Sequence, residues 1–543
     1  MNIMNSPESL PERVRRIAAD LKDLTQFYNI SISRSRHDRL HGYYSAELDA
    51  LHELDFDGLN QQHRVDFILL SHHLKRQLQQ LQLKVDAVDK YRVLIPFSND
   101  IISLCEARQA VVPLDAPKAA RDLDHVRQSI EQIHANVEHG RVVVDKTPSY
   151  QASKVIQELQ NHLGDWFSFY STYDPSFDWW VDRAYHVVDA ILSAYIQLVQ
   201  TKLVGTSSDI IGEPIGREWL LNELEAEMIP YTPEELLDIA QKEYDWCEQQ
   251  MKSIAQELGF SHWKDALEHV KNQYVIPGKQ TELVRELVDE GAAYVHRHNL
   301  VTVPPIAKQT WRMFMMPASQ QKMAPFFLGG PSILVASPTV DMSQELKEMV
   351  LRGNNRHFSR AVAFHEMIPG HRLQLFMAER HQPHRSLLFS TPFFVEGWAL
   401  YWEMLLWERR DFFVTPEDRI GTMFWRMHRC IRIVFSLKFH LGQLSPQECV
   451  DLLVDKVGHE RSTAQGEVRR SLEGSYGPLY QAGYMLGALQ MWKLRELVLK
   501  SNPEKMFHDD VLRVGVLPIE MLKALLLNEE LTADFKTKWR FYD

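Results

Sequence analysis

The chain has 543 residues, of which 45% are hydrophobic and 24% are charged, and both shares are ordinary for a globular protein. Its 60 basic and 72 acidic side chains give a net charge of −12, which argues against a surface that binds nucleic acid. The length allows one or two domains with an extensive core.

The N-terminus and the cysteines bear on where the protein resides. Residues 1–8 contain no basic region followed by an apolar run, and no stretch of the chain approaches 18 uninterrupted apolar residues. The cysteines lie far apart and form no C-x-x-C pair: Cys105, Cys247, Cys430 and Cys449. Such cysteines indicate buried thiols in a reducing compartment. We therefore expect a cytoplasmic protein with no signal peptide, no membrane span and no nucleic-acid partner; the sequence specifies no oligomeric state.

Helix is predicted along nearly the whole chain. Long amphipathic segments occupy residues 8–28, 58–90, 114–140, 150–172 and 177–204. Thr232, Thr415 and Ser445 each stand before a proline, with an acidic side chain in the following turn, which predicts three helix N-caps. We expect a mainly α fold in one continuous helical body. Residues 1–300 would wall a cleft, and residues 301–543 would carry the chemistry.

One E-x-x-H pair, Glu131 with His134, lies in the third of these segments. A carboxylate-bridged di-iron bundle typically needs two such pairs on separate helices, so the sequence does not favour that alternative. The clearest strand candidate is Ser332–Ser337, which lies between Gly-Gly-Pro and another proline. It is either a core strand or a sheet edge beside the cleft, where an extended peptide could pair with free backbone groups.

The segment His365-Glu366-Met367-Ile368-Pro369-Gly370-His371 is the most informative in the chain. Imidazole is a preferred ligand of Zn²⁺, and a neighbouring carboxylate can act as general base toward a metal-bound water. In a straight helix, residues six positions apart differ by about 240° in direction and about 9 Å in height, so they could not share one ion. Pro369 cannot donate a hydrogen bond to His365, so the helix must kink or end between the histidines. The alternative is a helix end that carries two histidines without a metal.

A second segment, residues 393–403, supplies two carboxylates within an apolar helix. Glu396 and Glu403 are seven residues apart and therefore share a helical face. Buried carboxylates are costly unless they are paired or bind a metal. We predict that Glu396 is the third zinc ligand and that Glu403 fixes a ligand histidine from outside the metal shell, or is an alternative ligand. The competing interpretation is a structural, salt-bridged glutamate at either position.

Residues 365–371 and 396–403 resemble the H-E-x-x-P-G-H and E-G-W-A-L-Y-x-E signatures of the bacterial domain of unknown function 885 family. The resemblance is good over about residues 220–500. It implies a zinc metallopeptidase with a helical architecture similar to angiotensin-converting enzyme and related gluzincins. Two looser matches are residues 429–440, where Lys438 replaces an acidic residue, and residues 467–484, where Ser471 replaces a tyrosine.

The reaction that these residues suggest is metal-assisted hydrolysis of an amide in a small or unfolded peptide. One Zn²⁺ per chain would be held by His365, His371 and Glu396, and Glu366 would be the general base. By resemblance to gluzincins, Tyr484 and His440 are candidates to stabilise the oxyanion. Tyr476 and Tyr480 are the substitutes if Tyr484 does not take this role.

The choice of substrate stays open at this point. A carboxypeptidase needs basic groups for the free carboxylate, and four arginines lie in the right part of the chain: Arg429, Arg432, Arg469 and Arg470. An aminopeptidase needs acids or carbonyls instead. A zinc hydrolase of a non-peptide amide or ester, and a catalytically silent helical binding protein, are the alternative functions.

Overall fold

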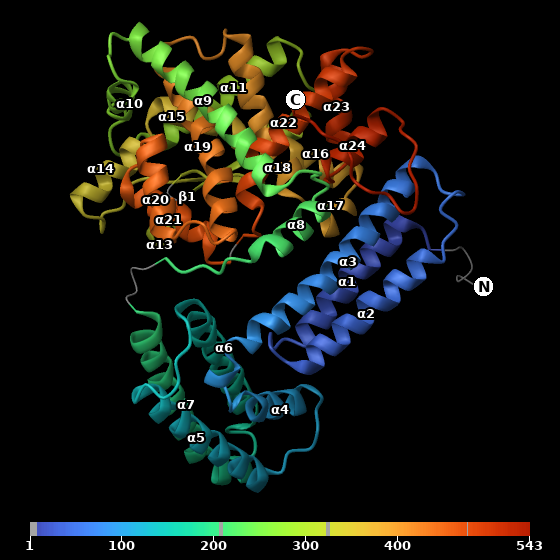
Figure 1. Cartoon of the computed structure of the whole chain (residues 1–543), viewed down its shortest axis with the longest axis vertical. Helices are drawn as coiled ribbons and strands as arrows, with labels where there is room; N and C mark the ends of the chain where they lie inside the picture. The colour runs from blue at the N-terminus through green and yellow to red at the C-terminus, as the bar shows by residue number, and fades with distance from the viewer. Residues whose placement is uncertain (1–7, 206–209, 322–325, 475, 543) are drawn as a thin grey trace. The chain divides into compact units, whose positions relative to one another are not determined.

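The structure is a computed structural model that describes residues 8–205, 210–321, 326–474 and 476–542 (Figure 1). Within these ranges it is mainly helical, and its one sheet has two strands. The prediction of a mainly α fold with a small sheet is therefore confirmed. The chain forms two compact units. Unit 1 comprises Met1–Arg15, Asp55–His73 and Gly212–Asp543, and unit 2 comprises Arg16–Leu54 and Leu74–Ile211.

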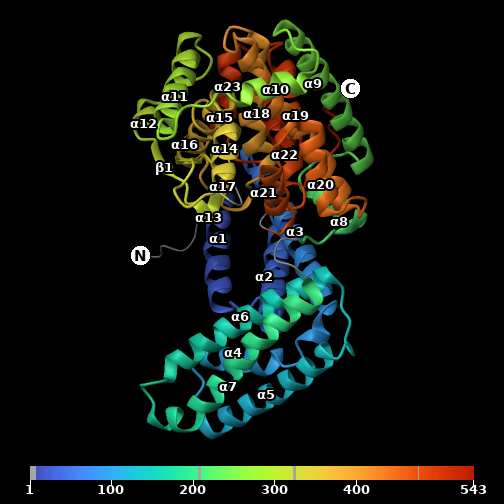
Figure 2. The same cartoon turned by 90° about the vertical axis from the view of Figure 1, so that its left-hand side faces the viewer.

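Unit 2 is a bundle of long helices around its own apolar core. Its elements are α2 (Arg34–His52), η1 (Arg92–Leu94), α4 (Ser98–Gln109), α5 (Ala116–Glu138), α6 (Lys146–Tyr170), α7 (Pro175–Val199) and η2 (Gln200–Val204). The unit boundary falls inside α1 (Leu10–Phe27) and α3 (Gln61–Asp89). Helix α7 packs against both α5 and α6 (Figure 2), and Trp166, Phe177 and Tyr195 are buried in the core that they share.

One helical stretch of unit 2, Pro175–Val204, is long and apolar enough to cross a membrane by length and composition. Charged residues such as Asp182 and Asp189 punctuate it, which is why the sequence shows no uninterrupted apolar run there. A third of its most apolar window (33%) is buried inside the protein. A single such helix is weak evidence, so this observation alone does not indicate a membrane protein.

Unit 1 contains both sequence motifs. Its elements are α8 (Gly216–Ala226), α9 (Pro233–Glu257), α10 (Trp263–Lys271), α11 (Gln280–Arg297), α12 (Pro305–Gln309), β1 (Arg312–Met315), α13 (Ala318–Gln321), β2 (Ser332–Val335), α14 (Gln344–Gly353), α15 (Arg356–Glu366), α16 (His371–His381), α17 (Arg385–Leu388), α18 (Pro392–Arg409), α19 (Pro416–His440), α20 (Pro446–Leu452), η3 (Leu453–Val457), α21 (Arg461–Leu472), α22 (Tyr480–Val498), α23 (Glu504–Arg513) and α24 (Ile519–Leu526).

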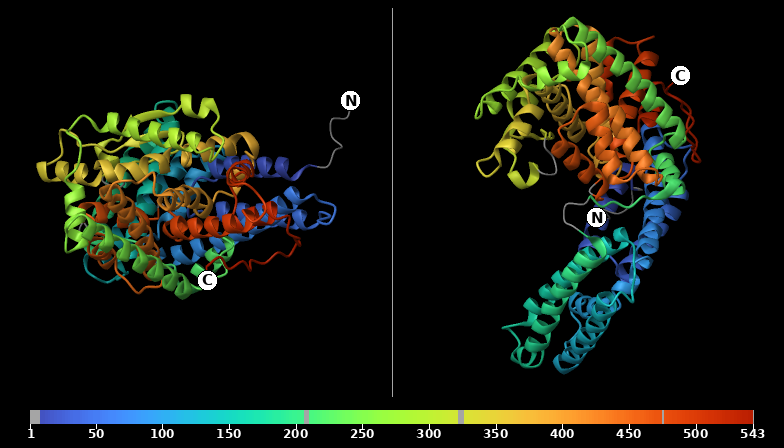
Figure 3. Two further views of the ribbon diagram at one scale, coloured as in Figure 1. Left: turned by 90° about the horizontal axis from the view of Figure 1, so that it is seen from above. Right: turned by 60° about the vertical axis from the view of Figure 1, so that its left-hand side comes forward.

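The core of unit 1 is built on α18, α19 and α22. Helices α18 and α19 are buried on all sides over most of their length, as expected of helices with apolar residues around the whole circumference. Helix α9 packs along α19, and α18 packs along α22 (Figures 1 and 3). The three predicted N-caps are confirmed, because the hydroxyls of Thr232, Thr415 and Ser445 each accept a backbone N–H in the first turn of α9, α19 and α20.

The small sheet pairs β1 with β2 in parallel, with Arg312 opposite Ser332. On its other side, Leu334 of β2 exchanges two backbone hydrogen bonds with Leu328. Strand β2 is therefore not the open edge that the sequence suggested as one alternative. The backbone that borders the cavity described below is the segment just before β2, residues 327–329.

The two units do not divide the chain at residue 300. Helices α8 to α11 belong to unit 1, where α9 packs on α19 and α11 packs on α15, so they support the helices that carry the motifs. Unit 2 is built from two segments, Arg16–Leu54 and Leu74–Ile211, and the residues between them belong to unit 1. This division differs from the boundary at residue 300 that the sequence suggested, because sequence periodicity does not reveal which distant helices pack together.

Candidate metal centre and adjoining cavity

The helix is interrupted between His365 and His371, as the position of Pro369 in the sequence predicts. Helix α15 ends at Glu366 and α16 begins at His371, and the Ile368–Pro369 peptide bond is cis. The backbone N–H of Gly370 donates to the carbonyl of Phe364 at 3.0 Å. A Cβ atom on Gly370 would collide with the carbonyl oxygen of His365, so only glycine fits this tight turn.

This turn brings two imidazoles and the carboxylate of Glu396 together. The Oε2 atom of Glu396 lies 3.1 Å from Nε2 of His371 and 3.5 Å from Nε2 of His365. Ligand atoms about 2.0–2.1 Å from a tetrahedral Zn²⁺ are about 3.4 Å from one another, so these separations match the edges of a zinc site. His365, Glu366 and His371 also place one ligand atom each within 4.8 Å of one another. Glu396 approaches both imidazoles more closely than that, and the donor set fits a divalent zinc ion.

Glu403 reaches the same cluster from one side. Nδ1 of His365 lies 2.7 Å from Oε1 of Glu403, and this contact leaves Nε2 of His365 directed toward Glu396. This is the geometry of a carboxylate that orients a metal-ligating histidine. Among the described residues, Nδ1 of His371 has no corresponding hydrogen-bond partner.

Glu366 is buried beside the histidines, with Oε2 at 3.9 Å from Nε2 of His371. It also lies against the backbone of Gly329, where a Cβ atom would collide with the Glu366 carboxylate. A carboxylate that borders both the metal cluster and an extended backbone segment is well placed to act as general base.

Burial and charge set the proton affinities of the cluster. Burial raises the pKa of Glu366, although the nearby histidines oppose the shift. Burial alone would lower the pKa of His365, but its contacts with Glu396 and Glu403 raise that pKa to about 9. Burial would also raise the pKa of Glu396, but His371 and His365 hold it well below its usual range. The negative charge of the buried carboxylates is thus balanced by the neighbouring histidines, and a bound metal ion would balance it in the same way.

The predicted oxyanion donors differ in whether they line the cavity. Tyr484 lines the cavity beside the candidate metal ligands, and its ring stacks on His365 with centroids 6.2 Å apart. Tyr480 lines the same cavity, and its O–H donates to Oε1 of Glu396 at 2.6 Å. His440 is the last residue of α19, packs against Phe439 and is not among the residues that line the cavity.

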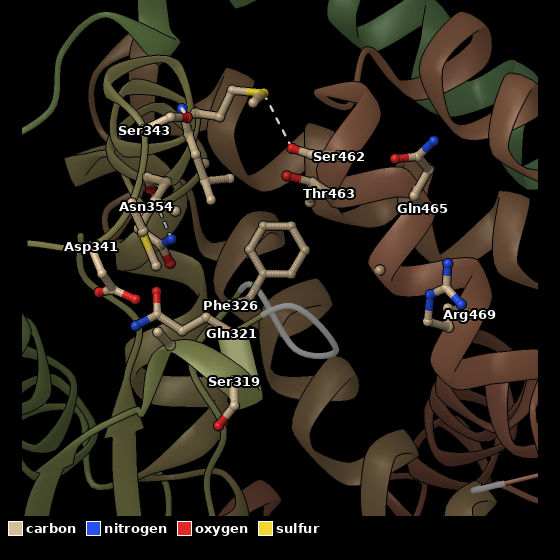
Figure 4. Close-up of a pocket in the computed structure, with 17 residues that line it drawn as sticks. Ser319, Gln321, Phe326, Asp341, Ser343, Asn354, Ser462, Thr463, Gln465 and Arg469 are labelled. Carbon is tan, nitrogen blue, oxygen red and sulfur yellow. Dashed lines mark hydrogen bonds between the residues drawn. The ribbon is translucent and has the colours of Figure 1, made fainter. Parts of the chain in front are cut away.

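The cavity has a volume of about 280 Å³ and contains the whole candidate cluster except Glu403. Arg429, Arg432 and Arg470 are part of its wall, whereas Arg469 lines a neighbouring cavity of about 640 Å³ (Figure 4). Phe326 lines both of these cavities. The aromatic and backbone wall at residues 326–329 carries no sequence motif, so it could not be predicted from the sequence.

The alternative di-iron pair has a simpler explanation. Glu131 and His134 lie on α5 in unit 2, and the Glu131 carboxylate forms a bidentate ion pair with Arg127 at 2.7 and 2.8 Å. Both Glu131 and His134 are partly exposed to solvent. The pair therefore belongs to a solvated helix face.

Residues 27–526 match the family described as "Bacterial protein of unknown function (DUF885)". The chain belongs to this family. No curated protein matches the sequence. Among solved structures, a protein from Shewanella oneidensis described as a "putative lipoprotein of unknown function" is similar over 96% of this chain and 100% of its own, with 17% identity and a TM-score of 0.71. A second, described as a "putative lipoprotein" from Colwellia psychrerythraea, has 15% identity over 91% of both chains and a TM-score of 0.60. At these identities the likeness shows that the fold is shared.

Proposed function

We propose that this DUF885 protein is a zinc-dependent hydrolase that cleaves peptide bonds in small or unfolded peptides. One observation carries the proposal: a single carboxylate oxygen of Glu396 lies within 3.5 Å of the Nε2 atoms of both His365 and His371. A Zn²⁺ ion held by these three residues would polarise a substrate carbonyl and lower the pKa of a bound water toward neutrality.

The chain's own residues would move the proton and hold the substrate. Glu366 would take a proton from water as the water oxygen adds to the carbonyl carbon. It would then pass that proton to the leaving nitrogen as the C–N bond breaks, giving a carboxylate and an amine. Tyr484 is the better-placed candidate to donate to the oxyanion, because it lines the cavity and stacks on a candidate ligand. Tyr480 would keep Glu396 oriented through its hydrogen bond.

The peptide proposal rests on the wall of the cavity. Gly329 offers backbone beside Glu366, and an extended peptide can pair with such a segment without demanding particular side chains. A hydrolase of non-peptide amides or esters would use the same metal residues. Panels of peptides, amides and esters would distinguish the two functions.

The test is hydrolysis by zinc-loaded protein and by a Glu366→Gln variant. We expect the variant to bind zinc normally and to lose at least a hundredfold in kcat, because it has no base for the attacking water. Glu379→Gln, on an exposed part of α16, is the matched control and should keep full activity. Equal activity of the Glu366→Gln variant and the native protein would exclude the proposed mechanism. Zinc binding without hydrolysis of any panel member would favour a catalytically silent binding protein.

We also propose a cytoplasmic location, which four free and buried cysteines support. The descriptions of the two similar structures as lipoproteins point the other way for those proteins. Fractionation of cells that express the native gene, followed by detection of the protein in the cytosolic or membrane fraction, decides between the two locations.

A further inference from the structure

Three arginines share the cavity with the candidate metal centre. Arg429 and Arg432 lie one turn apart on α19, and Arg470 comes from α21. All three are at least nine-tenths buried, and all three line the cavity of about 280 Å³ that also contains Glu366 and Glu396. Arginine is rarely buried in this way without anionic partners.

The protein supplies too few carboxylates for these three cations. Glu467 is shared, with Nη2 of Arg432 at 2.7 Å from one of its oxygens and Nε of Arg470 donating to the other at 2.9 Å. The nearest carboxylate to Arg429 is Glu403 at 3.7 Å, and that carboxylate already contacts His365 at 2.7 Å. One side of the cavity therefore carries an excess of positive charge.

Several guanidinium nitrogens are also left without partners. Nε of Arg429 and both Nε and Nη1 of Arg432 are buried and make no hydrogen bond to any described residue. The Tyr484 ring holds the two groups in place, with its centroid 4.8 Å from Arg429 Cζ and 4.4 Å from Arg432 Cζ. A guanidinium group that is held in place on the cavity wall suits the planar, two-oxygen geometry of a carboxylate.

We propose that Arg429 and Arg432, with Arg470 beside them, bind the free α-carboxylate at the C-terminus of a peptide substrate. The protein is then a carboxypeptidase. This inference rests on the proposed function, and it adds the end of the substrate that is recognised.

The arginines and the candidate metal residues line the same cavity, so only a short C-terminal stretch of an extended substrate, at about 3.5 Å per residue, lies between them. We therefore expect cleavage to release a short C-terminal fragment, such as a single amino acid or a dipeptide. The rest of the substrate extends away from the arginines, past the backbone of residues 327–329.

Binding can be measured without turnover in the Glu366→Gln variant, both zinc-loaded and metal-free. Calorimetric titration would use N-acetyl-trialanine as the free acid, the same peptide as its C-terminal amide, and N-acetyl-Ala-Ala-Glu amide. We expect the free acid to bind at least tenfold more tightly than either amide. Equal affinities for free acid and trialanine amide would overturn the proposal. Tight binding of the glutamate amide would assign the arginines to an acidic side chain and would also overturn it.

Because zinc itself binds carboxylates, arginine variants decide which group recognises the free acid. Arg429→Gln leaves the Glu467 ion pairs intact, and Arg432→Lys keeps the charge but removes the two-pronged geometry. In the Glu366→Gln background, each should reduce the preference for the free acid at least tenfold. Arg469→Ala, which alters the neighbouring cavity, should leave the preference unchanged. An unchanged preference in both cavity variants would overturn the proposal.

Mass spectrometry of products from the native protein separates this inference from the proposed function. Release of one or two C-terminal residues from free acids, with amides resistant, agrees with both. Equal cleavage of amidated peptides would overturn the carboxypeptidase inference while leaving a zinc peptidase. Selective binding of free acids without any cleavage would refute the proposed function while the carboxylate site stands.

Discussion

Gly397 of α18 and Gly487 of α22 lie in direct backbone contact. A Cβ atom on Gly397 would stand 2.6 Å from the carbonyl carbon of Gly487, and a Cβ atom on Gly487 would collide with the carbonyl oxygen of Phe393. The crossing lets α22 approach the helix that carries Glu396. It therefore positions Tyr484 and Tyr480, one and two turns before Gly487, beside the candidate metal cluster.

We predict that Gly487→Ala destabilises the protein by about 2 kcal/mol or more, because the helices must separate to admit a methyl group. Thermal unfolding would show a lower Tm. Gly42→Ala in the exposed part of α2 is the control. No atom lies within 4 Å of the added carbon, so the change should be neutral or slightly stabilising. Equal changes in Tm for Gly487→Ala and Gly42→Ala would contradict a close backbone contact between α18 and α22.

Glu403 should control zinc affinity without binding the metal. The Glu403→Gln variant loses the charged acceptor of His365 Nδ1, and we expect zinc affinity to fall ten- to a hundredfold. Competition with a fluorescent chelator measures the change. The exposed Glu408 on the same helix provides the control, and Glu408→Gln should bind zinc like the native protein. If Glu403→Gln bound zinc as tightly as the native protein, Glu403 would have only a structural role.

The two cavity tyrosines should differ in their effects. Tyr484→Phe removes the candidate oxyanion donor, so kcat should fall about a hundredfold while zinc affinity stays the same. Tyr480→Phe removes the hydrogen bond to Glu396, so it should weaken zinc binding first. His440→Ala should change neither quantity, because His440 does not line the cavity. Steady-state kinetics and zinc titration of all three variants check this, and a large loss of kcat in His440→Ala would contradict the site.

The buried Glu467 predicts a dependence of stability on pH. Burial alone would raise the pKa of Glu467, but the charges of Arg432 and Arg470 lower it to about 2. Because this pKa is lower in the folded state than the value of about 4.3 expected after unfolding, the ionised carboxylate stabilises the fold at neutral pH. That stabilisation is lost as the pH falls from about 5 toward 2.

We therefore expect Glu467→Gln to be less stable than the native protein by about 3 kcal/mol or more at pH 7, with a smaller difference at pH 3. Urea unfolding at the two pH values measures it. Glu379→Gln, at an exposed position, should have the same free energy of unfolding as the native protein at both pH values. If Glu467→Gln lowered the free energy of unfolding equally at both pH values, the buried ion pairs would be excluded as the cause.

The local features of the candidate metal centre follow from adjacent residues, which is why the sequence predicts them. Pro369 removes a donor four residues after His365, and the helix does end between the histidines. Helix caps such as Thr232 are equally local. The seven-residue spacing of Glu396 and Glu403 places both carboxylates on one face of α18, where both meet the histidines.

Features that depend on long-range packing could not be predicted in this way. The sequence suggests four arginines that could bind a carboxylate. Only the packing of α19, α21 and α22 shows that Arg469 lies outside the cavity of the candidate metal centre. The same packing makes Glu467 a shared partner of Arg432 and Arg470. His440 ends α19 away from the cavity wall for the same reason. The division of the chain into two units depends on which helices share a core, and amphipathic periodicity is the same in either arrangement.

The central claim is that His365, His371 and Glu396 hold one zinc ion. Elemental analysis of protein purified without added metal or chelator tests it most directly, with a His371→Ala variant prepared in parallel. We predict about one zinc per chain in the native protein and a loss of that zinc in the variant. A native protein that holds no zinc, even after zinc is supplied again under non-chelating conditions, would contradict the account.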